Sequence, residues 1–242
     1  MDIYSNFSFG GRNSLDFGLR VEERRVYSGS PRKVELQYIP GRTGGIPQNQ
    51  GYEENVEVNY NTWFRARDRT EVPALARRVR AWLLSSPGIY QELTDSTDPE
   101  YLRYALCTSE IDQEAAGGEF VRQTISFSCL PYLYLKSGMV SRTFYGSPTL
   151  YNPEAFDAKP FLKINGTGNI SLIINGSAWA LSNVDGYIEL DCEQQRAYKG
   201  QMNCNSQISG DGFPVLRPGD NPLVLRGSGY SSIEITPKWR TK

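Results

Sequence analysis

The feature that most constrains the fold of this chain is the spacing of turn residues in its last third, from Asn152 to Arg240. Short runs rich in β-branched and aromatic residues alternate there with glycine-rich turns, a pattern typical of an all-β domain. The stretch ends in two segments with demanding backbone geometry, FPVLRPGDN (Phe213–Asn221) and ITPKWR (Ile235–Arg240). Turn residues at this spacing restrict the backbone conformation strongly, and they supply no obvious reactive group. The sequence therefore favours a structural part over a catalyst.

The absence of histidine excludes several chemistries at once. The 242 residues include no His, which removes Ser-His-Asp and Cys-His nucleophile systems as well as imidazole metal sites. Four cysteines occur without CxxC spacing, so they predict neither a zinc site nor a redox motif. We expect them to be reduced, buried thiols: Cys107, Cys129, Cys192 and Cys204. We predict no catalytic residue, no cofactor and no metal site.

Charge and hydropathy bear on the partners of the chain. The 26 basic and 27 acidic residues give a net charge of −1, which removes the general electrostatic argument for nucleic-acid binding. The N-terminus, MDIYSNFSFGGRNSL, has neither the basic flank nor the apolar run of a signal peptide. No window approaches the roughly 18 apolar residues of a membrane span. We expect a protein that folds in a cytosol and does not insert into a membrane.

The first half of the sequence predicts an N-terminal β-rich domain over residues 1–135. Alternating apolar residues indicate half-buried strands over residues 15–21, 34–39, 56–64 and 119–130. The segment PGRTGG (Pro40–Gly45) separates two of these strands. Because Pro fixes φ and glycines accept positive φ, this segment predicts a turn that is either structural or a contact loop.

One amphipathic helix is predicted over residues 72–84. Its apolar positions fall on one helical face, with Thr70 as the N-cap and Pro73 in the first turn. The arginines that lie mainly off this face are Arg77, Arg78 and Arg80. They are open to three interpretations: a nucleic-acid surface, a solvated face or a subunit contact.

A linker over residues 136–151, rich in Gly, Ser and Pro, is predicted to lead into a C-terminal β-sandwich over residues 152–242. In this second domain Gly166-Thr167-Gly168 separates two predicted strands. Asn175-Gly176 and Asp185-Gly186 are each predicted to form a two-residue hairpin turn. The expected total is about seven or eight short strands, as in a sandwich.

Two functional alternatives come from the side chains of this sandwich. A glycosidase needs two carboxylates across a cleft, and the candidates are Asp185, Glu189, Asp191 and Glu193. The last three alternate along one predicted strand, where they are equally suited to a solvated edge. A carbohydrate-binding, host-adhesion module needs an aromatic platform, for which the candidates are Trp179, Tyr187 and Trp239, with Tyr198 also available. Aromatic residues at this spacing also serve as core or cross-strand pairs.

An ordered set of motifs covers nearly the whole chain. In the first half it comprises SLDFGLRVEE (14–23), IPGRTG (39–44), GYEENVEVNYNTWF (51–64), AWLL (81–84), DPEYLRYALCTSE (98–110) and GEFVRQTISFSCLPYLY (118–134). In the second half it comprises YNPEAFDAKPFLKINGTGNISLIING (151–176), followed by FPVLRPGDN and ITPKWR. In this order the set resembles the distal tail proteins of long-tailed, non-contractile bacteriophages and prophages.

The resemblance implies a mainly β fold, with an N-terminal β-rich domain that contains one α-helix and a C-terminal galectin-like or jelly-roll β-sandwich. It implies a structural role in the virion tail tip, after assembly in the host cytoplasm. The implied assembly is a homo-hexameric ring that joins the tail tube protein to the tail-associated baseplate protein, with a receptor-binding protein as a further candidate partner. DNA would pass through the ring without specific binding. The chain is too short to carry the large saccharide-binding insertion found in some members of that family.

Overall fold

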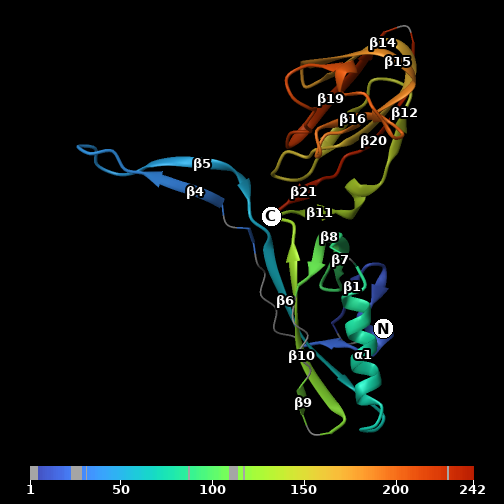
Figure 1. Cartoon of the computed structure of the whole chain (residues 1–242). Helices are drawn as coiled ribbons and strands as arrows, with labels where there is room; N and C mark the ends of the chain where they lie inside the picture. The colour runs from blue at the N-terminus through green and yellow to red at the C-terminus, as the bar shows by residue number, and fades with distance from the viewer. Residues whose placement is uncertain are drawn as a thin grey trace. The chain divides into compact units, whose positions relative to one another are not determined.

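The computed structural model describes residues 5–22, 29, 30, 32–86, 88–108, 114–116, 118–227 and 229–242. Its chain divides into two compact units, residues 1–133 with Lys242, and residues 134–241 (Figure 1). Both units consist mainly of β-strands, and the described residues contain one α-helix, α1 (Val72–Leu83). The predicted mainly β fold with a single helix near residues 72–84 is confirmed. Glu23, Ser109 and Glu110, which end two of the quoted motifs, lie outside the described residues.

The first unit contains one antiparallel sheet and a separate two-stranded hairpin. The strands of the sheet follow the order β2-β1-β7-β8-β10-β6-β3, with β9 on β10. Their bounds are β1 (Phe7–Phe9), β2 (Arg12–Asn13), β3 (Arg20–Val21), β6 (Val56–Arg65), β7 (Gln91–Asp95), β8 (Asp98–Cys107), β9 (Glu114–Ala116) and β10 (Phe120–Cys129). The hairpin comprises β4 (Arg32–Gln37) and β5 (Ile46–Glu53).

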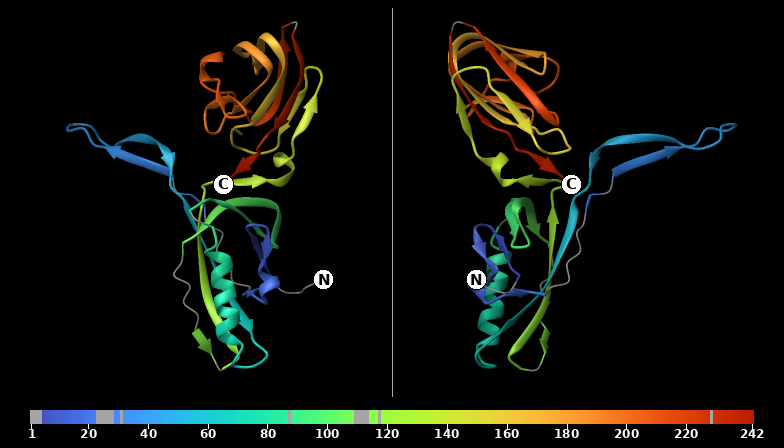
Figure 2. Two further views of the ribbon diagram at one scale, coloured as in Figure 1. Left: turned by 45° about the vertical axis from the view of Figure 1, so that its right-hand side comes forward. Right: turned by 180° about the vertical axis from the view of Figure 1, so that it is seen from behind.

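Helix α1 covers one face of this sheet, as both views of Figure 2 show. Its apolar face contributes Val79, Trp82 and Leu83 to a buried cluster with side chains of β1, β6 and β10. The Trp82 ring stacks on Phe17 with a centroid distance of 4.4 Å, and its Nε1 donates a hydrogen bond of 3.1 Å to the Phe9 carbonyl. The indole therefore anchors the helix through both its apolar surface and its single polar atom.

Two local predictions in this unit are wrong. Residues 15–21 do not form a strand: a 3₁₀ helix, η1 (Ser14–Phe17), precedes β3, because Asn13 caps it through the Leu15 N–H. Thr70 is not the N-cap of α1, whose cap position is Glu71 without a side-chain bond. The Asp68 carboxylate instead accepts hydrogen bonds from Thr70, which lowers the pKa of Asp68 and shapes the turn before the helix.

The segment predicted as a linker, residues 136–151, has regular structure. After β11 (Leu133–Leu135) it contains η2 (Lys136–Met139), β12 (Arg142–Phe144) and the first residues of β13 (Thr149–Asn152). β12 pairs with β20 and β13 pairs with β19, so this segment belongs to the second unit. The high Gly, Ser and Pro content of the segment reflects short strands separated by turns.

The second unit is all β apart from short 3₁₀ turns. Its strands follow the order β12-β20-β14-β15-β16-β17, while β13 and β14 both pair with β19, and β18 pairs with β15. The remaining bounds are β14 (Phe161–Ile174), β15 (Ser177–Asp191), β16 (Arg196–Lys199), β17 (Met202–Asn203), η3 (Asn205–Gln207), β18 (Ile208–Ser209), β19 (Gly219–Arg226), β20 (Tyr230–Thr236) and β21 (Arg240–Thr241).

One long bent strand pair, β14 and β15, links the parts of this unit. Residues 161–166 of β14 pair with β20, whereas residues 171–174 pair with β19, so the strand changes neighbour midway. The change occurs beside a very close backbone approach, where a Cβ on Gly229 would lie 1.8 Å from the Thr167 carbonyl oxygen. Only glycine fits there, and the approach fixes the position of the bend.

The two dipeptides predicted to form hairpin turns behave differently. Asn175-Gly176 is the turn between β14 and β15, with φ of 53° and 84°, which confirms the prediction. Asp185-Gly186 is not a turn: it lies within β15, paired with Thr167 and Gly166. Gly186 has a φ of 79°, which lets β15 follow the bend of β14 without ending. The sequence signal for a hairpin here marks a bend in a continuous strand.

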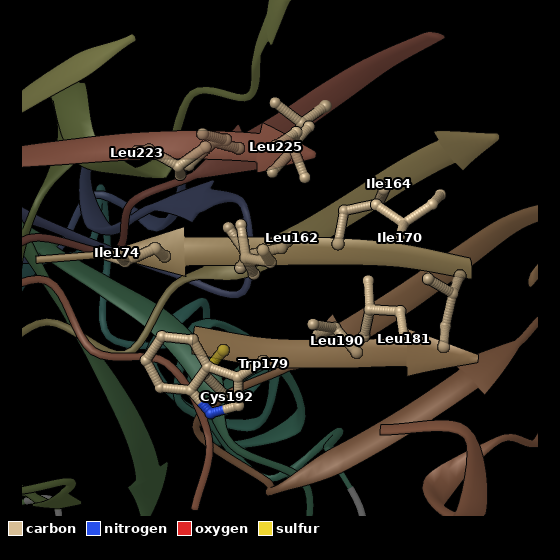
Figure 3. Close-up of a cluster of buried hydrophobic side chains, with 14 of the residues drawn as sticks. Leu162, Ile164, Ile170, Ile174, Trp179, Leu181, Leu190, Cys192, Leu223 and Leu225 are labelled. Carbon is tan, nitrogen blue, oxygen red and sulfur yellow. The ribbon is translucent and has the colours of Figure 1, made fainter. Parts of the chain in front are cut away.

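A single buried cluster fills the second unit, and Figure 3 shows part of it. Both halves of β14 contribute to it, through residues such as Leu162, Ile164, Leu172 and Ile174. Because the halves pair with different strands, the bend brings two layers of side chains against each other.

The segment Phe213–Asn221 is held by one fully buried amide. Asn221 Nδ2 donates to the carbonyls of Arg217 and Gly219, both at 2.8 Å, and to that of Leu150 at 3.3 Å. Its Oδ1 accepts from the Arg217 N–H at 2.8 Å and from Asn175 Nδ2 at 2.7 Å. This side chain therefore joins the loop to β13 and to the β14–β15 turn.

The segment Ile235–Arg240 closes the second unit through a polar network around Glu193. Glu193 Oε1 accepts from the Tyr134 hydroxyl at 3.0 Å and from Arg240 Nη1 at 3.4 Å. Lys238 Nζ lies 3.9 Å from Glu193 Oε2 and 3.6 Å from Asp191 Oδ1. The Arg240 side chain is 8% exposed and also donates from Nε to the Asp157 carbonyl at 2.7 Å. These contacts give the terminal segment a fold-locking role.

We predict that Glu193→Gln lowers the free energy of unfolding by about 1–3 kcal/mol, because it removes the negative charge that faces Lys238 and Arg240. The matched control is Asp185→Asn, whose side chain is 90% exposed and pairs with Lys199 on the surface. Urea unfolding of both variants measures the difference. Equal destabilisation by the two substitutions would contradict the network.

A second prediction concerns the thiols. Burial raises the pKa of the Cys129 thiol to about 12 and raises that of Cys192 as well, so neither forms the reactive thiolate at neutral pH. Cys204 is buried too, whereas Cys107 is half-buried. Titration with an aromatic disulfide reagent should modify Cys107 first in the native protein, and all four thiols after denaturation without reductant. A count below four would contradict the expectation of four reduced cysteines.

Candidate functional site

The hairpin β4–β5 is an exposed part of the first unit. Among the residues that the structure describes, its strands pair only with each other, in an antiparallel ladder from Gln37–Ile46 to Arg32–Glu53 (Figure 1). The predicted loop Pro40–Gly45 connects them, closed by a 3.1 Å bond from the Arg42 N–H to the Ile39 carbonyl. None of residues 33–52 is buried. The hairpin therefore has no hydrophobic core of its own.

Apolar side chains nevertheless concentrate on this hairpin. Tyr38 is 72% exposed and Leu36 is 51% exposed, and Val34, Ile39 and Tyr52 are further exposed large apolar residues of this hairpin and its loop. A two-stranded hairpin is marginally stable by itself in water, and a cluster of exposed apolar residues marks an interaction site. Its outer edges also present backbone groups without strand partners. Such a surface is suited to association with another protein surface.

Polar contacts hold the hairpin in shape without covering its apolar residues. Lys33 Nζ donates to Glu54 Oε1 at 2.6 Å, which raises the pKa of Lys33. Gln50 Nε2 donates to Glu35 Oε2 at 2.8 Å across the ladder. Both contacts are exposed to solvent, so they contribute orientation more than stability.

The outer face of α1 is a second exposed surface. Arg77, Arg78 and Arg80 are exposed, and Arg78 lies over the Phe17 ring at 5.9 Å from its centroid. These arginines are exposed, whereas Val79 and Trp82 of the same helix are buried. A solvated face and a subunit contact both remain consistent with this placement.

Each of the four candidate carboxylates interacts with groups close to it in the second unit. Asp185 pairs with Lys199 at 2.8 Å, and Glu189 accepts from the Gly200 N–H at 3.2 Å. The Asp191 carboxylate accepts from two N–H groups of the turn that follows β15. Glu193 lies in that turn and not on the strand, so the predicted alternation along one strand ends at Asp191. Each carboxylate thus has a structural role in shaping the β15–β16 region.

The three predicted platform residues have different surroundings. Trp179 and Trp239 are buried in the core cluster, at 5% and 7% exposure, and Trp179 Nε1 donates to the Gly212 carbonyl at 3.0 Å. Tyr187 lies outside that cluster, with Lys163 and Lys199 within 5.2 and 5.6 Å of its ring centroid. A sugar stacks on an exposed ring face, so burial of both tryptophans argues against a platform made from these three residues.

The part of the chain that the structure describes contains no group of three or more His, Cys, Asp or Glu residues placed to hold a metal ion. Among the same residues, α1 is too short and too polar to cross a bilayer, and no other helix meets the requirement.

Comparison with known proteins identifies the fold. No family model and no curated protein matches this sequence. Among solved structures, the chain is similar to the Dit protein of phage SPP1, with a TM-score of 0.73, 17% sequence identity, and coverage of 98% of this chain and 99% of that chain. That protein is described as a paradigm of the hub adsorption apparatus in phages that infect Gram-positive bacteria.

Two baseplate structures of phage P2, in an activated conformation with Ca and with Sr, also match. Each has a TM-score of 0.49, with 8% and 9% identity and coverage of 96% and 95% of this chain. Similarity at this level does not bear on function. The likeness to SPP1 Dit extends over both units, and the chain therefore has the fold of a phage distal tail hub protein.

Proposed function

We propose that this chain is a structural subunit of a phage tail tip, in which six copies form a ring that joins the tail tube to the adsorption apparatus. The likeness of the entire chain to the Dit protein of SPP1 carries the proposal, because it includes both units in the same order and leaves almost no residue of either chain unmatched. The chain acts without catalysis in this role. Its place is the virion tail tip, after assembly in the host cytoplasm.

The hairpin β4–β5 supports association of the first unit with neighbouring copies. Tyr38, Leu36 and Ile39 are exposed in the isolated chain, and burying them would recover the apolar contacts that the hairpin lacks. In a closed ring each subunit presents one surface to the next copy and a different surface to the previous one. The hairpin is suited to such a heterologous contact, because its apolar side chains are exposed and no core of its own buries them.

The charge balance supports passage of DNA without specific binding. A net charge of −1 gives no long-range attraction for phosphate, whereas a strongly basic inner wall would retain the DNA. The proposed partners are the tail tube protein on one side of the ring and the tail-associated baseplate protein on the other, with a receptor-binding protein as a further candidate.

The test compares the assembly of the native chain with that of a hairpin variant, Leu36→Ser/Tyr38→Ser. Serine is polar and is compatible with an exposed position. The double substitution removes two apolar side chains that belong to neither buried core. We expect the native chain to form rings with six times the chain mass of 27.3 kDa, alone or with the tail tube protein, and the variant to remain mainly monomeric. Light scattering and negative-stain imaging measure both.

Tyr145→Ser is the matched control, since Tyr145 is 81% exposed and lies in the second unit, outside the hairpin. It should assemble like the native chain. A native chain that stays strictly monomeric at high concentration, even beside the tail tube protein, would refute the ring. Rings that form equally well from the hairpin variant would refute the role of the hairpin in assembly without contradicting the proposed ring.

A further inference from the structure

A polar pocket of about 380 Å³ lies in the second unit, where β15 ends and β16 and β17 follow. Its volume falls within the roughly 300–1,000 Å³ typical of small-molecule sites. The side chains that give the pocket its chemistry are Asp191, Gln194, Arg196, Tyr198, Asn203 and Asn205. None of them belongs to the hairpin; Tyr198 is one of the aromatic residues available to the predicted platform, and Asp191 is one of the four candidate carboxylates.

Several polar groups of this pocket are fixed in position by the backbone. Asn203 Oδ1 accepts from the Asn205 N–H at 2.8 Å, and Asn205 Oδ1 accepts from the Ala197 N–H at 2.6 Å. Each amide plane is thereby oriented, and each Nδ2 group retains its donors for a ligand. Asp191 Oδ1 accepts from the N–H groups of Glu193 and Gln194 at 3.0 and 3.1 Å. The pocket is therefore organised before any ligand binds.

Other lining groups have unused hydrogen-bonding capacity. Within the described residues, Arg196 and Tyr198 make no side-chain hydrogen bond, and Arg196 is exposed. Tyr198 is half-buried, and its ring gives the pocket one apolar surface. Burial and the nearby Glu189 and Asp191 carboxylates raise the pKa of Tyr198, so its hydroxyl stays protonated and can donate.

The residues that line the pocket disfavour several classes of ligand. A lipophilic ligand is disfavoured because Tyr198 and Ala197 supply the main apolar contacts. A free anion is disfavoured because Arg196 is the only cation that lines the pocket and Asp191 opposes it. A cation is disfavoured because Asp191 is the only carboxylate in the lining and already faces Lys238. Neutral molecules that carry several adjacent hydroxyl groups remain.

We propose that this pocket binds one neutral sugar unit of a glycan. Adjacent sugar hydroxyls act as both donors and acceptors, and the paired N–H groups of Asn203, Asn205 and Arg196 are suited to them. The C–H face of a pyranose ring would lie against Tyr198, and Asp191 would accept one hydroxyl proton. This site is independent of the ring proposed above, because it needs only the second unit of one chain.

Sugar titration of the full chain, followed by amide NMR, tests the proposal. The probes are methyl glucoside, methyl galactoside and N-acetylglucosamine, each added to on the order of 100 mM. We expect at least one of them to shift the backbone amides of residues 196–205, with a Kd of about 1 mM or weaker for so few contacts.

Three variants test whether the sugar binds in this pocket. Tyr198→Ala and Arg196→Ala should each weaken it by about tenfold, whereas Tyr198→Phe, which keeps the ring, should retain most of it. Arg196→Ala removes an exposed side chain without a hydrogen bond, so its fold should be unaffected. Tyr151→Ala is the control, because Tyr151 is 65% exposed on β13 of the same unit and does not line the pocket.

Three results would each overturn the proposal. The first is the absence of shifts at residues 196–205 with all three sugars, and the second is binding that neither Tyr198→Ala nor Arg196→Ala weakens. Tighter binding of glucose 6-phosphate than of methyl glucoside would also refute it, since that result would identify an anion site. Failure of the ring assembly would not affect any of these readouts.

Discussion

The antiparallel pairing of β14 with β15 is the interaction on which the second unit depends. It extends from Phe161–Asp191 to the Asn175-Gly176 turn, and both strands bend together where Gly166 faces Gly186. The bend lets β14 pair with β20 at one end and β19 at the other, so a single strand pair supplies both layers of the core. A backbone without Cβ atoms at this point is what allows the two layers to close. The Asn221 amide and the Glu193 network then fix the loops around that frame.

The hairpin β4–β5 lies outside the buried cores of both units. In the second unit, β14 and β15 place leucine and isoleucine side chains inside a core. In the first unit, the sheet and α1 form their own core, but the hairpin β4–β5 contributes nothing to it. Tyr38 and Leu36 lie in solvent, and exposed apolar residues grouped in this way are suited to association. The stable cores position the hairpin, and the hairpin is the part suited to association.

Much of the fold could be predicted from local sequence patterns. The helix over residues 72–84, the loop Pro40–Gly45 and the Asn175-Gly176 turn depend on periodicity or on positive φ, which neighbouring residues determine. The errors occurred where a distant contact decided the outcome. Asp185-Gly186 has the composition of a turn, but its pairing with residues 166 and 167 keeps it inside a strand. Residues 15–21 alternate like a strand, but the Asn13 cap and a close fit under Trp82 make a 3₁₀ turn. Asp191 and Tyr198 of the candidate pocket were candidates from the sequence, whereas Arg196, Asn203 and Asn205 were missed because no motif marks them before β15, β16 and β17 fold into adjacent strands.

Local sequence patterns were enough to predict the β class, the helix over residues 72–84, the lack of imidazole chemistry and the ordered motifs that resemble distal tail proteins. These follow from composition, from periodicity and from residues with restricted φ, all of which are local properties. Which aromatic residues are buried, which carboxylates are engaged and which apolar residues remain exposed depends on the tertiary structure. Trp179, Trp239 and Tyr38 are all aromatic, yet the first two fill a core and the third lies in solvent. The reason is that burial depends on which strands pair across the fold, and that pairing is set by the whole chain.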